Sequence, residues 1–170
     1  NQKLIELQIK LPTPPQSQGS YVPWVISNNL VFISGQIPID NNGKLYKKGI
    51  VPTQVSVDEA IESAKLSAIN ILSHLKVACN NDLDRVSKVI KLGGFVASSN
   101  SFTEHPKIIN GASDLFVSVF GDKAKHARFA IGASSLPLGA PVEVDAIFEI
   151  IWIMSKEEIT VHFCESIKNI

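Results

Sequence analysis

The chain has 170 residues, of which 45% are hydrophobic and 19% are charged, and its 16 basic residues balance its 16 acidic ones. This length fits one compact domain, and the composition excludes a disordered or fibrous protein. Zero net charge argues against a surface that gathers nucleic acid, and no apolar run approaches the roughly 20 residues that a membrane span needs. We therefore expect no nucleic-acid partner and no membrane partner.

The first part of the chain predicts strands. Residues 3–10 alternate apolar and polar side chains, which is typical of a strand. The proline-rich and serine-rich residues 11–20 predict a loop. Residues 21–26 and 30–34 are two further strand-like runs, and the polar residues 27–29 between them predict a β-hairpin.

A long loop and a long helix follow the hairpin. The turn sequence at residues 40–43 opens the loop. Ser56 and Glu59 have the capping-box spacing that begins a helix. Apolar residues recur at helical spacing behind them, so we predict an amphipathic helix over residues 57–78 that ends at the polar residues 80–82.

The middle of the chain predicts a strand and a second helix. Residues 85–97 are rich in strand-forming residues, although the glycine pair 93–94 implies a bulge or a close backbone approach within the strand. Pro106 suits the first turn of a helix that we expect to end at about residue 120. Gly121 suits the position just past that end.

The last part of the chain returns to strands. Residues 125–133 and 141–153 are strand-like, and the sequence Leu-Pro-Leu-Gly at residues 136–139 predicts the turn between them. We expect residues 1–153 to form a single domain and residues 154–170 to be a carboxyl-terminal appendage.

The order of these elements predicts an α+β fold with two helices on one face of a mixed sheet. The other face of the sheet is also partly apolar, because Ile147 follows Glu143 and Asp145 in the outward positions of the last strand. An uncovered face of this kind implies oligomerisation.

The cysteines and histidines do not form a metal-binding pattern. Cys79 and Cys164 are too few for a disulfide framework or a zinc site, so we expect reduced thiols and no metal. The four histidines are scattered, without a pair at metal-ligand spacing. We expect a cytoplasmic protein, with an organelle as the alternative, because the chain begins at Asn1 and a start region can precede it.

Several short motifs stand out together. They are Gly19-x-Tyr21, the sequence Ser-Gly-Gln-Ile-Pro at residues 34–38, Asn110 near the start of the second helix, Ala127-Arg128, Leu136-Pro137 and Val142-Glu143. In their order and spacing the motifs resemble those of the RidA/YjgF reactive-intermediate deaminase family, which also carries the name endoribonuclease L-PSP. The resemblance covers most of residues 15–150.

The resemblance implies a chorismate-mutase-like fold assembled as a homotrimer, with the sheets lining a central barrel and the sites lying between subunits. It also implies a hydrolase that deaminates small 2-imino acids, or their enamine tautomers, to 2-keto acids and ammonia without a cofactor. The expected partners are the imino-acid or keto-acid ligand and other copies of the chain.

The resemblance assigns chemical roles to three residues. Arg128 is expected to bind the substrate carboxylate through a bidentate guanidinium contact, and Glu143 to position or activate water as a general base. Tyr21 would supply an aromatic wall and a phenol that orient the ligand. The alternatives are a structural salt bridge for Arg128, a solvated carboxylate for Glu143 and ordinary packing for Tyr21.

Four further residues complete the expected site. Ser34 and Gly35 would present a hydroxyl and backbone N–H groups to the ligand, although Gly35 can equally mark a tight strand end. Asn110 is expected either to donate to the substrate or to cap the second helix. Ala130 stands where many relatives have cysteine, so this position offers the ligand at most its backbone N–H.

Departures from the family pattern leave the reaction open. His126 replaces a proline of many relatives and is expected to touch the site or to lie on the surface, and Trp24 would reshape the pocket. One alternative function is a non-catalytic module that binds or senses a small carboxylate, for which Glu143 is dispensable. Another is a ribonuclease, which zero net charge and the lack of a suitable acid–base pair of side chains disfavour.

Overall fold

Five strands form one mixed sheet in the computed structural model, which describes residues 2–14 and 19–151. The strands are β1 (Trp24–Ser27), β2 (Leu30–Gln36), β3 (Val86–Ala97), β4 (Ala127–Ala133) and β5 (Val142–Ile150). Their order across the sheet is β1-β2-β5-β3-β4, so β5 lies at the centre and β4 at an edge. Only β3 and β4 are parallel, and the other neighbours are antiparallel.

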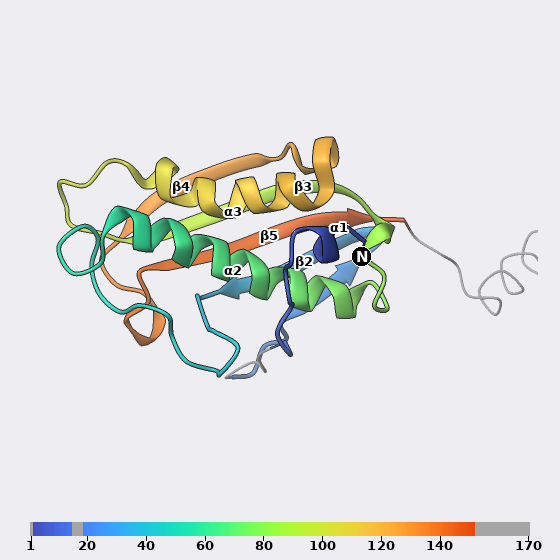
Figure 1. The fold of residues 1–170 in the computed structure, drawn as a ribbon, viewed down its shortest axis with the longest axis horizontal. Coiled ribbons are helices and arrows are strands. Elements are labelled where there is room, and N and C mark those ends of the chain that lie inside the picture. The colour runs from blue at the N-terminus through green and yellow to red at the C-terminus, as the bar shows by residue number, and fades with distance from the viewer. Residues whose placement is uncertain (1, 15–18, 152–170) are drawn as a thin grey trace, which may run out of the picture.

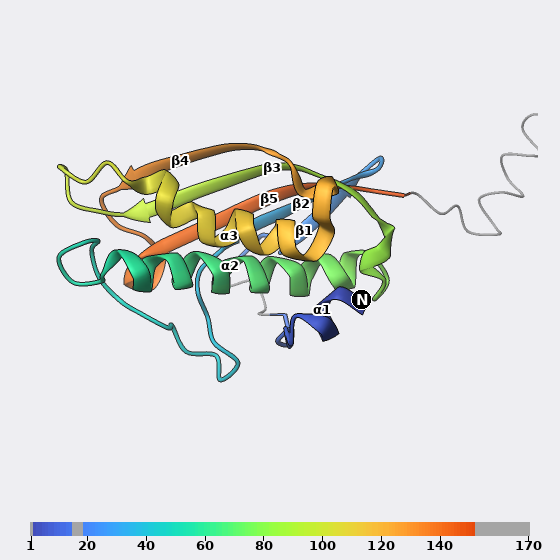
Figure 2. The ribbon, with the colours of Figure 1, turned by 45° about the horizontal axis from the view of Figure 1, so that its top comes forward.

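Two long helices, α2 (Val57–Ala78) and α3 (His105–Phe120), lie on the same face of this sheet (Figures 1 and 2). The predicted α+β class, with a mixed sheet and two helices on one face, is therefore confirmed. None of the helices in the described residues is long and apolar enough to cross a bilayer. The division into a domain over residues 1–153 and an appendage over 154–170 stays a prediction, because residues 152–170 lie outside the described part.

The amino-terminal segment is a helix, α1 (Gln2–Glu6), so the strand predicted over residues 3–10 is wrong. Lys3 and Glu6 form an ion pair of 2.9 Å one helical turn apart, and Leu4 is buried against the core while Ile5 is 72% exposed. A strand needs a neighbour for its backbone hydrogen bonds, whereas a helix satisfies its own. A period-two pattern over so few residues is also compatible with a helical turn.

The hairpin of β1 and β2 turns at Asn28, as predicted, and Ser27 pairs with Leu30 across it. Asn28 has a φ of 53°, a left-handed conformation that asparagine tolerates better than most residues. β1 begins at Trp24, so the predicted strand starts too early and Tyr21 precedes it.

The two long helices begin and end near their predicted residues because the signals are local. Ser56 accepts a hydrogen bond from the backbone of Glu59, and the Glu59 carboxylate accepts one from the backbone of Ser56, which together form the predicted capping box of α2. Pro106 lies in the first turn of α3, and Gly121 follows its last residue with a φ of 62°.

The core lies between the sheet and the helices. The buried residues of β5 alternate with half-buried ones, and its Phe148 ring packs edge-on against Phe116 of α3 at 5.5 Å between centroids. The other sheet face carries no helix (Figure 2). We call it the open face, and the side chains that lie on it include Phe32, Phe95, Phe129, Ile131, Glu143, Asp145 and Ile147.

The glycine pair in β3 allows a close approach rather than a bulge. A Cβ atom on Gly93 would overlap the carboxylate of Asp145, and one on Gly94 would overlap the side chain of Ile109 in α3. The irregular pairings of β3 lie earlier in the strand, before Leu92. These glycines therefore let a carboxylate lie on one sheet face and a helix pack on the other.

Candidate functional site

Arg128 lies on the edge strand β4, and its side chain is held against α3 by three hydrogen bonds. Nη1 donates to the Asn110 Oδ1 at 2.8 Å and to the Ser113 Oγ at 3.0 Å. Nη2 donates to the carbonyl oxygen of Pro106 at 3.4 Å. The guanidinium is exposed, and within residues 2–14 and 19–151 it takes part in no ion pair.

The hydrogen bonds of Arg128 leave two of its five N–H groups without a described partner, one on Nε and one on Nη2. Two N–H groups on neighbouring nitrogens match the two oxygens of a carboxylate. The structural ion pair that was the alternative role for Arg128 is therefore not found among the described residues, and the arrangement suits an external anion.

Asn110 orients Arg128 and does not cap α3. It lies in the second turn of the helix, whereas the residue before the helix is Glu104, so the capping role considered for Asn110 is wrong. Its Oδ1 accepts from Arg128, which leaves the amide N–H groups of Asn110 facing the same region. Sequence alone cannot reveal this contact, because it joins two residues 18 positions apart.

Ser113 belongs to the same network and carries no motif that singles it out in the sequence. His126 Nδ1 donates to the carbonyl oxygen of Ala124, so in the neutral imidazole the His126 Nε2, 3.1 Å from the Ser113 Oγ, accepts from the hydroxyl. The hydroxyl oxygen can then accept from Arg128. His126 therefore reaches the site indirectly, by fixing the orientation of Ser113.

Glu143 lies on the open face, where its carboxylate extends across Gly35 of β2. A Cβ atom on Gly35 would overlap Glu143 Oε1, so glycine is needed there for space. Burial raises the pKa of Glu143, and the negative charge of Asp145 raises it further. Both effects favour the protonated carboxyl over the carboxylate. When Glu143 is ionised, its carboxylate therefore binds a proton more tightly and is a better general base.

The raised pKa of Glu143 predicts a pH-dependent effect of Glu143→Gln on stability. The folded chain holds this proton more tightly than the unfolded chain, so the wild type loses stability as pH rises above about 4.5, the ordinary value. Glutamine does not titrate. The free energy of unfolding of Glu143→Gln in urea is therefore expected to rise relative to that of the wild type between pH 4 and pH 8. Glu6→Gln is the control and should show the opposite sign, because Lys3 lowers the pKa of Glu6. If the free energies of unfolding of Glu143→Gln and the wild type change with pH in parallel, the raised pKa of Glu143 is contradicted.

Arg128 and Glu143 face opposite sides of the sheet within one chain. Arg128 pairs with Leu92, a core residue on the helix side, whereas Glu143 pairs with Phe95 on the open face. One small ligand bound to a single chain therefore cannot touch both side chains.

The other expected site residues are only partly available to a ligand. Tyr21 is 54% exposed, and its hydroxyl has no hydrogen bond to the described residues. The Ser34 hydroxyl already donates to the carbonyl oxygen of Val22 at 2.8 Å, which leaves only its acceptor capacity. Ala130 shares the helix-facing side of β4 with Arg128 and packs against the core.

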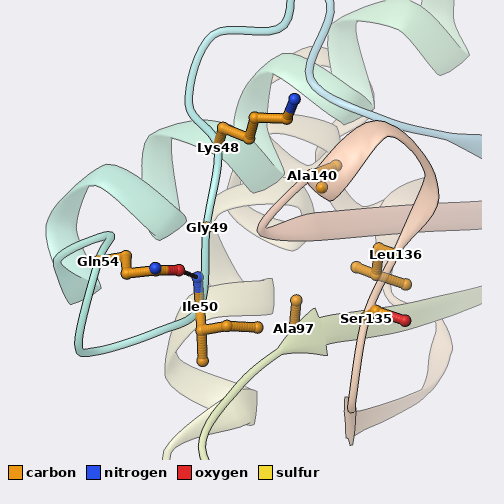
Figure 3. Close-up of a pocket in the computed structure, with 9 residues that line it drawn as sticks. Lys48, Gly49, Ile50, Gln54, Ala97, Ser135, Leu136 and Ala140 are labelled. Atoms are coloured by element: carbon orange, nitrogen blue, oxygen red, sulfur yellow. Dashed lines mark hydrogen bonds between the residues drawn. The ribbon is translucent and has the colours of Figure 1, made fainter.

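A cavity of about 200 Å³ lies elsewhere, between the carboxyl end of β3 and the turn that precedes β5 (Figure 3). Among the described residues that line it Lys48 alone is charged, and the Gln54 Oε1 at its wall accepts a hydrogen bond from the backbone of Ile50. None of the seven residues predicted for the site lines this cavity. The cavity and the Arg128 network are therefore separate features of the chain.

The described residues offer no group of three His, Cys, Asp or Glu side chains placed to hold a metal ion. Cys79 is buried, and burial raises the pKa of its thiol to about 11. This thiol is therefore protonated at neutral pH and is a poor nucleophile. Cys164 lies outside the described residues.

Known proteins resemble the chain over most of its length. A family model described as "YjgF/chorismate mutase-like, putative endoribonuclease" matches residues 1–150. Protein TCP17 of Trypanosoma cruzi is 43% identical over 148 residues, which cover 86% of this chain and 91% of TCP17. The crystal structure of Atu1372, a protein of unknown function from Agrobacterium tumefaciens, has a TM-score of 0.82 and 46% identity and covers 88% of this chain and 91% of its own. A 2-iminobutanoate/2-iminopropanoate deaminase of Dermatophagoides farinae is 28% identical over 139 residues, or 82% of this chain and 92% of that protein.

Proposed function

Because the chain belongs to the RidA/YjgF family, we propose that it hydrolyses small 2-imino acids, or their enamine tautomers, to 2-keto acids and ammonia. The observation that carries this proposal is the guanidinium of Arg128, which α3 holds in place while two of its N–H groups remain for a carboxylate. The deaminase of Dermatophagoides farinae is a relative whose named activity has substrates with such a carboxylate.

The chemistry needs a bound carboxylate, a water molecule and a proton acceptor. Water adds to the carbon of the protonated imine and loses a proton to the carboxylate of Glu143. The nitrogen of the resulting carbinolamine takes this proton back from Glu143 and leaves as ammonia. The hydroxyl of the carbinolamine gives its own proton to the Glu143 carboxylate, which leaves a keto group on the same carbon. No covalent intermediate with the protein is required, so orientation and proton transfer supply the rate enhancement.

Two copies of the chain would contribute to each site. Arg128 and Glu143 lie on opposite faces of one sheet, so both reach a single ligand only when Glu143 belongs to a neighbouring subunit. Burial of the open face in a homotrimer would bring this about and would cover the exposed Phe32 and Ile131. Sedimentation should then give three times the chain mass of 18.5 kDa, and a monomer at working concentration would contradict the shared site.

The decisive experiment measures turnover and binding in the Glu143→Gln variant. Threonine dehydratase generates 2-iminobutanoate in the assay, and the wild type is expected to speed its loss. The variant should lose this activity while still binding 2-oxobutanoate in calorimetry, because Arg128 is unchanged. Glu149→Gln is the matched control, since Glu149 lies on the same strand and bonds to Ser87 and Asn29 away from the proposed site. If the wild type does not speed the loss of 2-iminobutanoate, the proposed deaminase activity is excluded.

Ser113→Ala is expected to weaken the binding of 2-oxobutanoate by about fivefold, since Arg128 loses one of the three hydrogen bonds that orient it. Calorimetry gives this change directly. Ser118→Ala on the same helix is the control, because the Ser118 hydroxyl bonds to the Leu115 carbonyl and does not contact Arg128. Equal affinities of Ser113→Ala and the wild type would show that α3 does not position Arg128.

A second candidate is a non-catalytic module that binds a small carboxylate. The same Arg128 arrangement favours it, because the guanidinium is oriented without Glu143. This function predicts full binding and no turnover in the wild type. A ribonuclease is disfavoured by the zero net charge, and RNA binding that is absent or insensitive to salt would exclude it.

A further inference from the structure

Ser98 and His105 form a hydrogen-bonded pair that the proposed function does not use. The Ser98 Oγ lies 2.9 Å from the His105 Nε2, and both residues are half-buried. The ring of Phe102 packs edge-on against the imidazole at 5.3 Å between centroids. The pair joins the end of β3 to the first residue of α3.

The pair borders the same side of β4 as Arg128. A Cβ atom on Gly132 would lie 2.7 Å from the His105 Nε2 and 2.9 Å from the Ser98 Oγ, so the pair packs directly against the backbone of Gly132, where only glycine leaves room for it. Arg128, Ala130 and Gly132 alternate along one side of the edge strand. Gly132 is exposed, and Ala130 is the residue of β4 that lies between it and Arg128 on this side.

Arg128 extends toward the pair. Its Cα is four residues from that of Gly132, roughly 13 Å along a strand. The guanidinium covers part of this length, because its Nη2 reaches the carbonyl oxygen of Pro106, the residue next to His105. A small carboxylate bound to Arg128 can therefore direct its other end along β4 toward Ser98 and His105.

The pair can both donate and accept a hydrogen bond. When the Ser98 hydroxyl donates to His105, its oxygen still accepts, and when the His105 Nε2 donates to Ser98, the hydroxyl hydrogen is available. A hydroxyl on the ligand suits either state, since it also donates and accepts. An alkyl group in the same place would leave the remaining hydrogen-bonding capacity of the pair unused.

We infer that Ser98 and His105 bind a hydroxyl on the side chain of the ligand whose carboxylate Arg128 holds, so the preferred substrates are hydroxylated imino acids rather than alkyl ones. The inference deepens the proposed function and rests on it. It assigns a specificity role to the pair and leaves proton transfer in hydrolysis to Glu143.

The test compares two keto acids of nearly equal size, 3-hydroxypyruvate and 2-oxobutanoate, which differ by a hydroxyl in place of a methyl. Calorimetry on the wild type is expected to give about tenfold tighter binding of 3-hydroxypyruvate, the effect of one well-placed hydrogen bond. Ser98→Ala should bind both equally, with the affinity for 2-oxobutanoate unchanged. Ser101→Ala is the control, because Ser101 is exposed in the same segment and should keep the preference.

Gly132→Ala provides a second variant that keeps Ser98 and His105. Its methyl group would overlap the two polar atoms and displace them, so the preference for 3-hydroxypyruvate should disappear while Arg128 still binds the carboxylate. Equal binding of both keto acids by the wild type, with Arg128→Ala abolishing both, overturns the inference and leaves the proposed function intact. A hydroxyl preference that survives in both variants also overturns it. If the wild type binds neither keto acid, the inference and the carboxylate site fail together.

Discussion

Replacing Arg128 with alanine is expected to weaken the binding of 2-oxobutanoate, and to slow the loss of 2-iminobutanoate, by about a hundredfold or more. Alanine removes both N–H groups that remain for a carboxylate and leaves Asn110 and Ser113 without the group they orient. Arg128→Lys should lose nearly as much, although it keeps the charge, because an ammonium cannot form the planar bidentate contact. Calorimetry and the coupled dehydratase assay measure the two losses.

Lys125→Ala separates the role of Arg128 from a general effect of positive charge. Lys125 lies three residues before Arg128 and forms an exposed ion pair of 2.9 Å with Asp122. Its removal should leave affinity within about twofold of the wild type, since exposed charges of this kind contribute little. If Arg128→Ala and the wild type behave alike in both measurements, the carboxylate site at Arg128 and a deaminase that depends on it are both excluded.

The largest effect on stability is expected from Gly111→Ala. Gly111 is buried where α3 crosses α2, and a Cβ atom there would overlap the backbone carbonyl oxygen of Ile61. A backbone atom cannot rotate away as a side chain can, so the two helices must separate and the core beneath them loosens. We expect the free energy of unfolding in urea to fall by about 3 kcal/mol, even though alanine favours a helix over glycine by about 1 kcal/mol.

Asp114→Ala is the matched control for Gly111→Ala. Asp114 is exposed on the same helix. Its replacement therefore introduces the same helix-favouring alanine without a clash in the core. Its free energy of unfolding should stay within about 0.5 kcal/mol of the wild type. A Gly111→Ala variant that is as stable as this control would show that the helices do not approach as closely as the structure describes.

The sequence predicts those parts of the fold that depend on local interactions. The capping box at Ser56 and the apolar spacing behind it place α2 at its observed bounds, because the interacting residues are within a few positions of one another. The same local pattern fails for α1, since whether residues 3–10 pair as a strand depends on a neighbour far away in the chain.

The candidate site could be predicted only in part for the same reason. Motifs identify Arg128 and Glu143, but the partners of Arg128 lie 15 to 22 positions away on α3, and Ser113 carries no motif of its own. The face of the sheet on which Arg128 or Glu143 lies also depends on the register in which β3, β4 and β5 pair. The sequence alone does not give this register.

The position of β5 has a consequence for how the protein is made. β5 is the last strand of the part of the chain that the structure describes, yet it joins β2 to β3 at the centre of the sheet. A growing polypeptide that has not yet reached residue 150 contains the β1–β2 hairpin and the β3–β4 pair without the strand that joins them into one sheet. The sheet therefore closes only once β5 has been translated, and until then its partly apolar strands are exposed to chaperones and to aggregation.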